Sequence, residues 1–184
     1  MQETVEKSEQ AELIGYPITL KKFILFDLIS FGVFQRIWAF KHFRALNGPG
    51  KAKTFAAVVF AVFLPITLFG MLKNYESKSA ELGLPIIFKK YLLAVTYFMI
   101  GILVNAISRV PTIPDWVTCA VGPLALIPLV IVQHKINLLN TNLRPGLPFA
   151  PRLSWQSWLC LVIAIVFLIL AGIGMFFPEP VPGT

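Results

Sequence analysis

Six polar residues lie within or beside long apolar stretches of this chain, where a polar side chain needs a partner or has a function. They are Asp27, Asn105, Arg109, Gln133, His134 and Asn137. Asp27 is an acid inside an apolar stretch, and Lys21 and Lys22 lie close to it on the preceding helical turns. We expect it to pair with a lysine or with interfacial water. The alternative is a functional site, because an acid in such a stretch is a candidate for one.

A second candidate site joins Asn105 and Arg109, which are four residues apart and share one face of a helix. The next apolar stretch contains Pro123 and Pro128, so we expect its helix to be bent. These features could line a polar cleft. The alternative is ordinary hydrogen bonding and packing between helices.

Enzymatic and metal chemistry find little support in the residue types. The only histidines, His42 and His134, lie at the ends of apolar stretches, where we expect them to be solvated. The chain offers too few ligands of suitable spacing for a metal site. It lacks the common catalytic and phosphate-binding motifs. We therefore expect no catalytic residue, no metal, no cofactor and no enzyme activity.

The elements that position these residues are five apolar runs, at 23–40, 55–72, 91–108, 116–132 and 155–177. The chain is 57% hydrophobic and 14% charged, against roughly a quarter charged in soluble domains. The sequence predicts an all-α integral membrane protein with one helical membrane domain over 19–177. We expect a mobile tail at 1–18 and an extended tail at 178–184.

At least three runs, the last three, are predicted to span a bilayer. The first has about a dozen apolar residues before Arg36, with Gly32 as a weak point, and a span needs about 20. The second is interrupted by Pro65, which favours a kink or a hairpin. The first two runs are therefore predicted to be re-entrant or interfacial, and a model in which all five span stays open.

Basic and aromatic residues flank the runs, as is typical of residues that anchor a protein at lipid headgroups. The net charge of +7 therefore indicates a bilayer with anionic headgroups as partner, rather than nucleic acid. A membrane-protein partner or a homo-oligomer is possible. The predicted anchors are Lys21, Lys22, Arg36, Trp38, Lys41, Arg44, Lys89, Lys90, Trp155 and Trp158.

Cationic residues also predict orientation, because cytoplasmic loops are enriched in Lys and Arg. If only the last three runs span, Arg109 alone of the 16 Lys and Arg residues is outside. If all five span, the split is ten against six. Both models place the 133–152 loop in the cytoplasm and the C-terminus outside. They differ over residues 35–53.

Two stretches carry a resemblance to a known family. One covers Lys21–Lys41, with Ser30-Phe31-Gly32-Val33-Phe34 and Ile37-Trp38-Ala39-Phe40-Lys41; the other covers Pro128–Asn140, with Gln133, Ile136-Asn137 and Asn140. They resemble a family of uncharacterised multi-pass proteins of bacterial inner membranes. There the first stretch has Thr-Phe-Gly-x-Tyr and then Tyr-Trp, so Ser30, Phe34 and Ile37 depart from it. The resemblance implies a multi-pass inner-membrane location and supplies no activity to carry over to this chain.

Two functions follow as hypotheses. The first is a non-catalytic accessory, scaffold or lipid-organising component of a bacterial inner membrane, which the basic, aromatic-rich segments favour. The second is a small permease or transporter subunit with a cleft around Asn105, Arg109 and the bent fourth helix. A polar cavity reaching mid-membrane favours the second, and a dry apolar bundle favours the first.

Overall fold

The computed structural model describes residues 14–48, 50–145, 162 and 166. Over these residues the chain is helical and contains no strand. The elements are α2 (Leu20–Ile29), α3 (Val33–Asn47), α4 (Lys51–Val62), α5 (Leu64–Glu81), α6 (Lys90–Ile107), α7 (Asp115–Val121), the short 3₁₀ helix η1 (Gly122–Ala125) and α8 (Leu126–Leu143).

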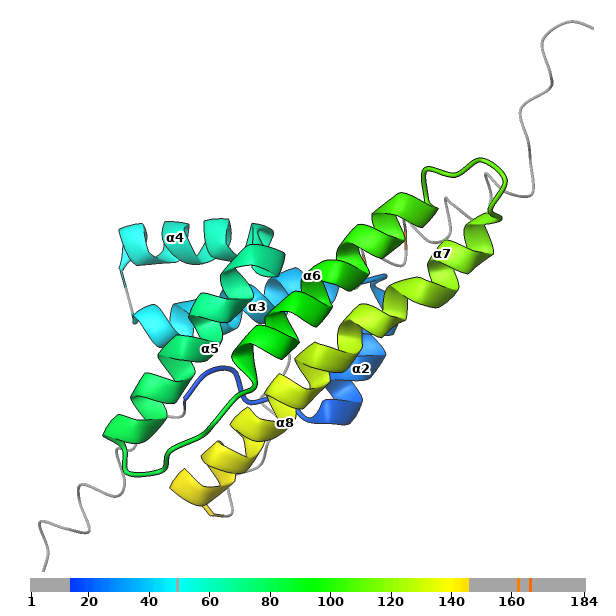
Figure 1. The fold of residues 1–184 in the computed structure, drawn as a ribbon. Coiled ribbons are helices and arrows are strands. Elements are labelled where there is room, and N and C mark those ends of the chain that lie inside the picture. Colours follow the sequence, from blue (N-terminus) through cyan, green and yellow to red (C-terminus); the bar gives the residue numbers. More distant parts are fainter. Residues whose placement is uncertain (1–13, 49, 146–161, 163–165, 167–184) are drawn as a thin grey trace, which may run out of the picture.

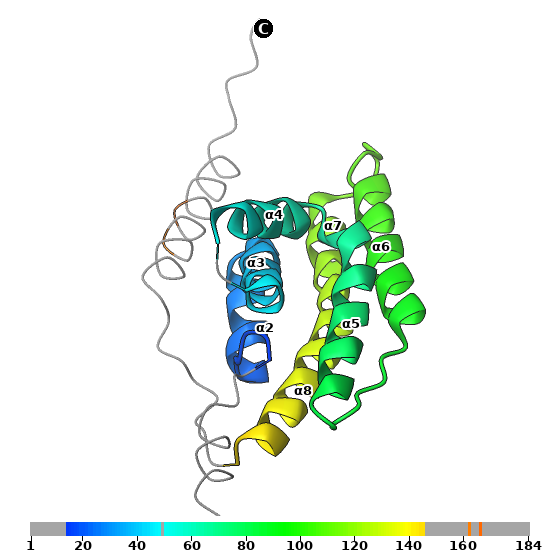
Figure 2. The same cartoon turned by 90° about the vertical axis from the view of Figure 1, so that its left-hand side faces the viewer.

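Long helices form one layer of the molecule. α5, α6 and the rod made by α7, η1 and α8 run side by side, and α4 lies across their direction (Figures 1 and 2). α2 packs against α8, and α3 packs against α4 and α5. The end of α5, the start of α6 and the end of α8 lie toward one end of this layer, and the 108–114 connection lies at the other (Figure 1).

The first two apolar runs are each broken into two helices. Phe31 and Gly32 have positive φ angles of 49° and 81° between α2 and α3, so the chain turns at the glycine expected to be weak. Pro65 lies in the first turn of α5, directly after the break at Phe63. At 1.5 Å per residue, α2 is about 15 Å long and α4 about 18 Å. Both are much shorter than a ~30 Å hydrocarbon core.

The third and fourth runs form long helices. α6 covers the third run nearly as predicted. The fourth is bent as expected, because η1 interrupts it at Gly122 and Pro123 before it continues as α8 to Leu143. If the helix ended with the second run, the polar residues 73–90 would form the connector to the third. Instead, α5 continues to Glu81, so only residues 82–89 connect α5 to α6.

Two helices in the described part of the chain are long and apolar enough to cross a membrane: Lys90–Ile107 and Trp116–Leu143. Their mean hydropathies are 1.7 and 1.9. Apart from Val162 and Val166, the fifth run at 155–177 lies outside the described residues. So do the predicted anchors Trp155 and Trp158 and both predicted tails except residues 14–18.

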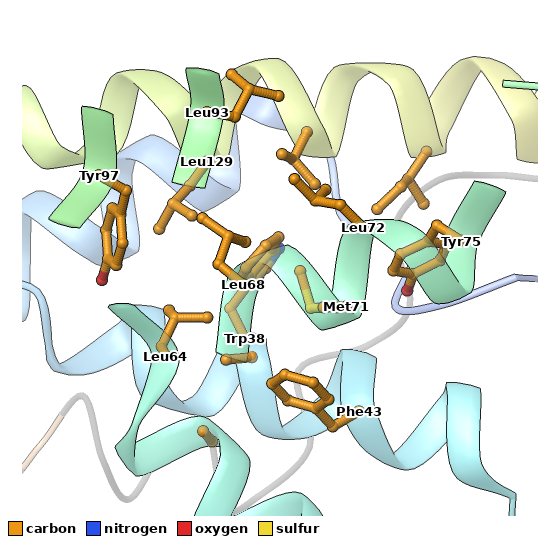
Figure 3. Packing of buried hydrophobic residues seen from close by; sticks show 14 of the residues in the cluster. Trp38, Phe43, Leu64, Leu68, Met71, Leu72, Tyr75, Leu93, Tyr97 and Leu129 are labelled. Carbon is orange, nitrogen blue, oxygen red and sulfur yellow. The ribbon is translucent and has the colours of Figure 1, made fainter. Parts of the chain in front are cut away.

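The core lies where α3, α5 and α8 meet, with α6 beside them (Figure 3). Trp38, Leu68, Leu72 and Leu129 are each 0% exposed there. The prediction that Trp38 anchors the protein at lipid headgroups is therefore wrong. Trp38 lies on the buried face of α3, and its ring packs 4.3 Å from the ring of His42, centroid to centroid.

Candidate functional site

A buried hydrogen-bond network surrounds His42, which is 0% exposed. Its Nε2 lies 3.1 Å from Gln133 Oε1 and its Nδ1 lies 2.5 Å from Tyr75 Oη. Trp38 Nε1 donates to the same Gln133 oxygen at 2.6 Å. If His42 is neutral and carries its proton on Nε2, this nitrogen and Trp38 Nε1 both donate to Gln133 Oε1. The unprotonated Nδ1 of His42 then accepts from the Tyr75 hydroxyl.

The same network fixes the chain before α2 to helix α8. Gln133 Nε2 donates to the carbonyls of Tyr16 and Ile18, and Asn137 Nδ2 donates to Ile18 at 2.8 Å. Asn140 forms two bonds with the backbone of Ile14, at 3.0 and 3.1 Å. Gln133, Asn137 and Asn140 share one face of α8. Their side chains form the hydrogen bonds with backbone groups of residues 14–18 that another stretch of backbone would form in regular secondary structure.

The expectation that His42 is solvated is wrong, whereas His134 is exposed. Burial lowers the pKa of His42 to about 3, although the bond to Gln133 opposes this. A signal was present in the sequence. Phe34, Trp38, His42 and Leu46 recur every four residues and form one buried stripe of α3. The network serves packing, because all of its polar atoms are used within the protein.

Asp27 belongs to a second polar chain at the α2–α3 corner. Tyr97 Oη donates to Gln35 Oε1 at 2.7 Å, and Gln35 Nε2 donates to Asp27 Oδ2 at 2.9 Å. Asp27 is 3% exposed, and its Oδ1 is buried without a hydrogen-bond partner. The expectation that Asp27 pairs with Lys21 or Lys22 is therefore wrong.

A pocket of about 750 Å³ opens beside this corner. Its polar lining comes from Asp27, Gln35, Arg36 and Thr118. Gly32, Gly101 and Gly122 contribute walls without side chains, and the remainder is apolar. The apolar lining residues are Leu28, Phe31, Val33, Val104, Pro123 and Ala125. The arrangement can hold a mostly apolar molecule with one polar group, as is usual for small-molecule sites.

Asn105 and Arg109, for which a polar cleft was one of two alternatives, are both exposed, and neither lines this pocket. Of the sequence candidates, the structure joins Gln133 and Asn137 in the His42 network and places Asp27 in the pocket. Sequence reasoning missed Gln35 and Tyr97. Gln35 follows Asp27 by eight residues, but the break at Gly32 makes helical spacing uninformative there.

The predicted anchors have varied surroundings. Arg36 donates to the carbonyls of Ala61 and Val62 and so caps the end of α4. The Lys41 ammonium lies 4.2 Å from the centroid of the Tyr16 ring. Exposed anchors, for which the headgroup role stays a prediction, are Lys21, Arg44 and Lys89. Lys22 is half-buried.

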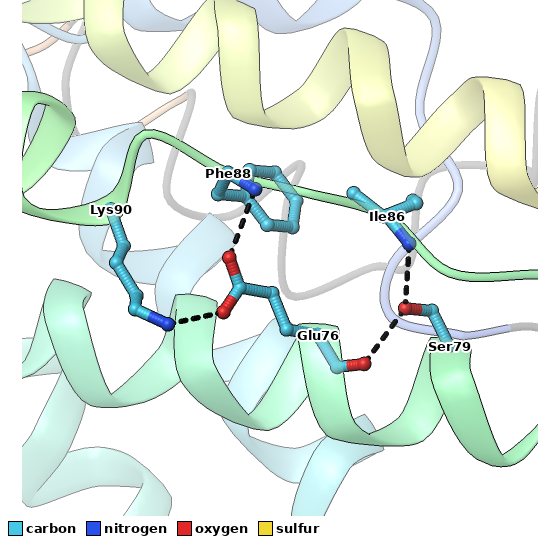
Figure 4. A network of polar contacts seen from close by, with 5 residues as sticks. All are labelled: Glu76, Ser79, Ile86, Phe88 and Lys90. Atoms are coloured by element: carbon cyan, nitrogen blue, oxygen red, sulfur yellow. Dashed lines mark hydrogen bonds and ion pairs between the residues drawn. The ribbon is translucent and has the colours of Figure 1, made fainter.

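Lys90, another predicted anchor, takes part in a network that holds the 82–89 connector against α5 (Figure 4). Glu76 accepts from Lys90 Nζ at 2.5 Å and from the Phe88 amide at 2.9 Å. Ser79 accepts from the Ile86 amide. Burial acts to raise the pKa of Glu76, but the bonds from Lys90 and Phe88 and the charges of Lys90 and Lys135 lower it below its ordinary value.

Comparison with known proteins gives no relative: no protein-family model, curated protein or solved structure matches this chain.

Proposed function

We propose that this chain is a multi-pass integral protein of a bacterial inner membrane, acting as a non-catalytic accessory, scaffold or lipid-organising component. One observation carries the proposal. Only 11% of the residues in the apolar window of Lys90–Ile107 are buried inside the structure, and 29% in that of Trp116–Leu143. A core helix of a soluble protein would be mostly buried, so these apolar faces need lipid or a partner.

Exposed apolar side chains on α4 and at Phe63, directly after it, support the same conclusion. Phe55, Val62 and Phe63 are 71%, 58% and 55% exposed. In water this surface would favour aggregation, whereas in a bilayer it contacts acyl chains. Lys51 and Lys53 lie at the start of α4, where they suit anionic headgroups.

The proposed topology keeps three spans: α6, the rod from α7 to α8, and the run at 155–177. The α2–α3 and α4–α5 pairs enter the membrane or lie at its surface without crossing it, a choice supported by the ~15 and ~18 Å lengths of α2 and α4. Residues 133–152, which begin with the part of α8 beyond Val132, are then cytoplasmic, as are residues 45–53, and the C-terminus is outside. The resemblance of 21–41 and 128–140 to inner-membrane proteins agrees with this location.

Cysteine labelling tests the topology. Single cysteines replace Ala52 or Ser108, both exposed, in a background without Cys119 and Cys160. Gly48 is avoided because its φ of 76° disfavours any side chain. On intact spheroplasts, an impermeant thiol reagent should label the Ser108→Cys variant at once and the Ala52→Cys variant only after lysis. Immediate labelling of both would support five spans and reject the three-span arrangement.

The lipid-organising role has its own test. The protein is reconstituted in vesicles of mixed anionic and zwitterionic phospholipids and extracted in a mild detergent, and the retained proteins and lipids are identified by mass spectrometry. Anionic lipids should be enriched over the bulk composition. Equal proportions in the extract and the vesicle, with no protein retained, would contradict the role.

A second function, a small permease or transporter subunit, is favoured by the pocket beside Asp27. Its lining differs from the cleft expected around Asn105 and Arg109. Leakage or uptake of a labelled solute by proteoliposomes, compared with empty vesicles, would favour this second function over the first.

A further inference from the structure

The first described residues of the chain are held in place between α3 and α8. Asn140 of α8 bonds to both the amide and the carbonyl of Ile14, at 3.0 and 3.1 Å. The Tyr16 amide lies 3.5 Å from His42 Nδ1 of α3. Residues 1–13 therefore start from a fixed position beside these two helices.

Three cationic residues lie next to the groups that hold this start. Lys41 Nζ is 4.2 Å from the centroid of the Tyr16 ring. Arg44 is exposed and follows Lys41 by three residues in α3, so the two share one side of the helix. Arg144 directly follows α8, and its amide bonds to the Asn140 carbonyl at 2.9 Å. We call Lys41, Arg44 and Arg144 the basic cluster.

The segment that precedes Ile14 is acidic. Its acids are Glu3, Glu6, Glu9 and Glu12, which are four of the nine Asp and Glu residues of the whole chain. One lysine against these four glutamates gives the side chains of residues 1–13 a net charge of −3. Opposite charges thus lie on the two sides of Ile14.

The acidic segment cannot move far from the basic cluster. Glu12 is two residues from Ile14 and Glu9 is five, so their Cα atoms lie at most ~7 and ~18 Å from that of Ile14. A short tether of this kind gives the carboxylates an effective concentration of roughly millimolar order at the cluster. Binding within one chain is therefore favoured even though single exposed ion pairs are weak.

We propose that residues 1–13 bind the basic cluster and compete there with the anionic phospholipid headgroups of the cytoplasmic leaflet. In the proposed topology Arg144 and residues 45–53, which directly follow Arg44, are cytoplasmic, so the cluster is on the side where anionic lipids attract Lys and Arg. An anionic bilayer displaces the segment, and a neutral one leaves it bound. This inference rests on the proposed lipid-organising function and adds regulation of its headgroup contacts.

Carbodiimide cross-linking tests the contact, because it joins a carboxylate to an amine only where the two touch. On the full chain in an uncharged maltoside detergent at low salt, mass spectrometry should find Glu9 or Glu12 joined to Lys41. About 1 M NaCl, which shortens the Debye length to about 3 Å, should abolish this product, and so should dioctanoyl phosphatidylglycerol. The part-buried Glu76–Lys90 ion pair is the internal control and should stay cross-linked in both conditions.

A mixture of unlabelled and ¹⁵N-labelled protein identifies the chain that supplies the acidic segment. Contacts within one chain give cross-linked peptides of a single isotope. Peptides of mixed isotope would assign the segment to a second copy and overturn the proposal.

Titration with dioctanoyl phosphatidylglycerol in the same detergent tests the competition. A variant with Glu6, Glu9 and Glu12 all changed to Gln should bind this lipid about fivefold more tightly than wild type. The gain should shrink when Arg44→Gln is added. It should be unchanged when the matched Arg109→Gln is added, because Arg109 is also exposed but lies at the other end of the long helices (Figure 1).

Absence of the cross-link to Lys41 at low salt would overturn the proposal, as would a cross-link that survives 1 M NaCl. Equal phosphatidylglycerol affinity in the glutamine variant and wild type, with both preferring it to phosphatidylcholine, would also overturn it. Failure of the lipid function looks different: both lipids would bind alike in every variant. That result would reject the competition, while the salt-sensitive cross-link would still uphold the contact between the acidic segment and the basic cluster.

Discussion

Gly15 lies directly against Tyr75, although the two are far apart in the sequence. A Cβ added at Gly15 would be 2.1 Å from Tyr75 Oη and 2.8 Å from His42 Nδ1. The glycine also has a φ of 79°, a conformation that side chains disfavour. The 14–18 segment can therefore reach α8 only because this position has no side chain.

Gly15→Ala should lower the unfolding free energy by about 2–4 kcal/mol, because it adds a clash in the core to the strain of a positive φ. Thermal unfolding in detergent measures the loss. Gly83→Ala is the control, since Gly83 has a φ of 72° but open space at its Cβ. It should cost about 1 kcal/mol. Equal losses in both variants would show that the contact with Tyr75 contributes nothing.

The low pKa of His42 predicts acid sensitivity. The folded state keeps His42 neutral down to about pH 3, whereas the unfolded chain takes up a proton near pH 6.5. Stability should therefore fall as the pH drops below 6.5, by up to about 1.4 kcal/mol per unit. Unfolding curves from pH 7.5 to 5 measure this slope.

The matched variants for this slope are His42→Gln and His134→Gln. Replacing exposed His134 should leave the slope intact, whereas replacing His42 should flatten it even if the variant is less stable overall. A slope that survives in His42→Gln would assign the proton uptake to another group.

Trp38→Phe tests the core position of this tryptophan. The change removes the Nε1–H bond to Gln133 and leaves a small cavity, so we expect a loss of about 2–3 kcal/mol. Trp116→Phe, at a side chain 70% exposed, should change stability by under about 0.5 kcal/mol. Similar small effects in both variants would restore the anchor interpretation of Trp38.

Glu76→Gln should loosen the 82–89 connector by removing the ion pair with Lys90 and weakening the bond to the Phe88 amide. We expect a loss of about 1 kcal/mol and faster hydrogen exchange at Ile86 and Phe88. Because the pKa of Glu76 is lowered on folding, its stabilisation is present above the unfolded pKa near 4.5 and is lost as the pH falls below it.

Glu81→Gln serves as the control for Glu76→Gln, since Glu81 lies on the same helix and, among the described residues, accepts from the exposed Ser77 hydroxyl. Its exchange rates at Ile86 and Phe88 should match those of wild type. A matching acceleration in both variants would mean that the Lys90 pair does not hold the connector.

Composition and the spacing of apolar residues determined the helical class, the extent of α6, the bend in the fourth helix, and the breaks near Gly32 and Pro65, but not that the fourth helix continues to Leu143. These features depend on local properties, such as the backbone freedom of glycine and the missing amide of proline. The sequence also identified Gln133 and Asn137 as polar residues in need of partners.

Only the tertiary structure decided which groups meet. Trp38, with its interfacial indole, and His42, beside Lys41, appeared to belong at the surface, but helix packing buries both against Tyr75 and Gln133. Asp27 lies within reach of lysines along its own helix, yet the turn at Gly32 brings Gln35 to it instead. Such pairings depend on contacts between distant segments, and helical periodicity reports only which face of one helix is apolar.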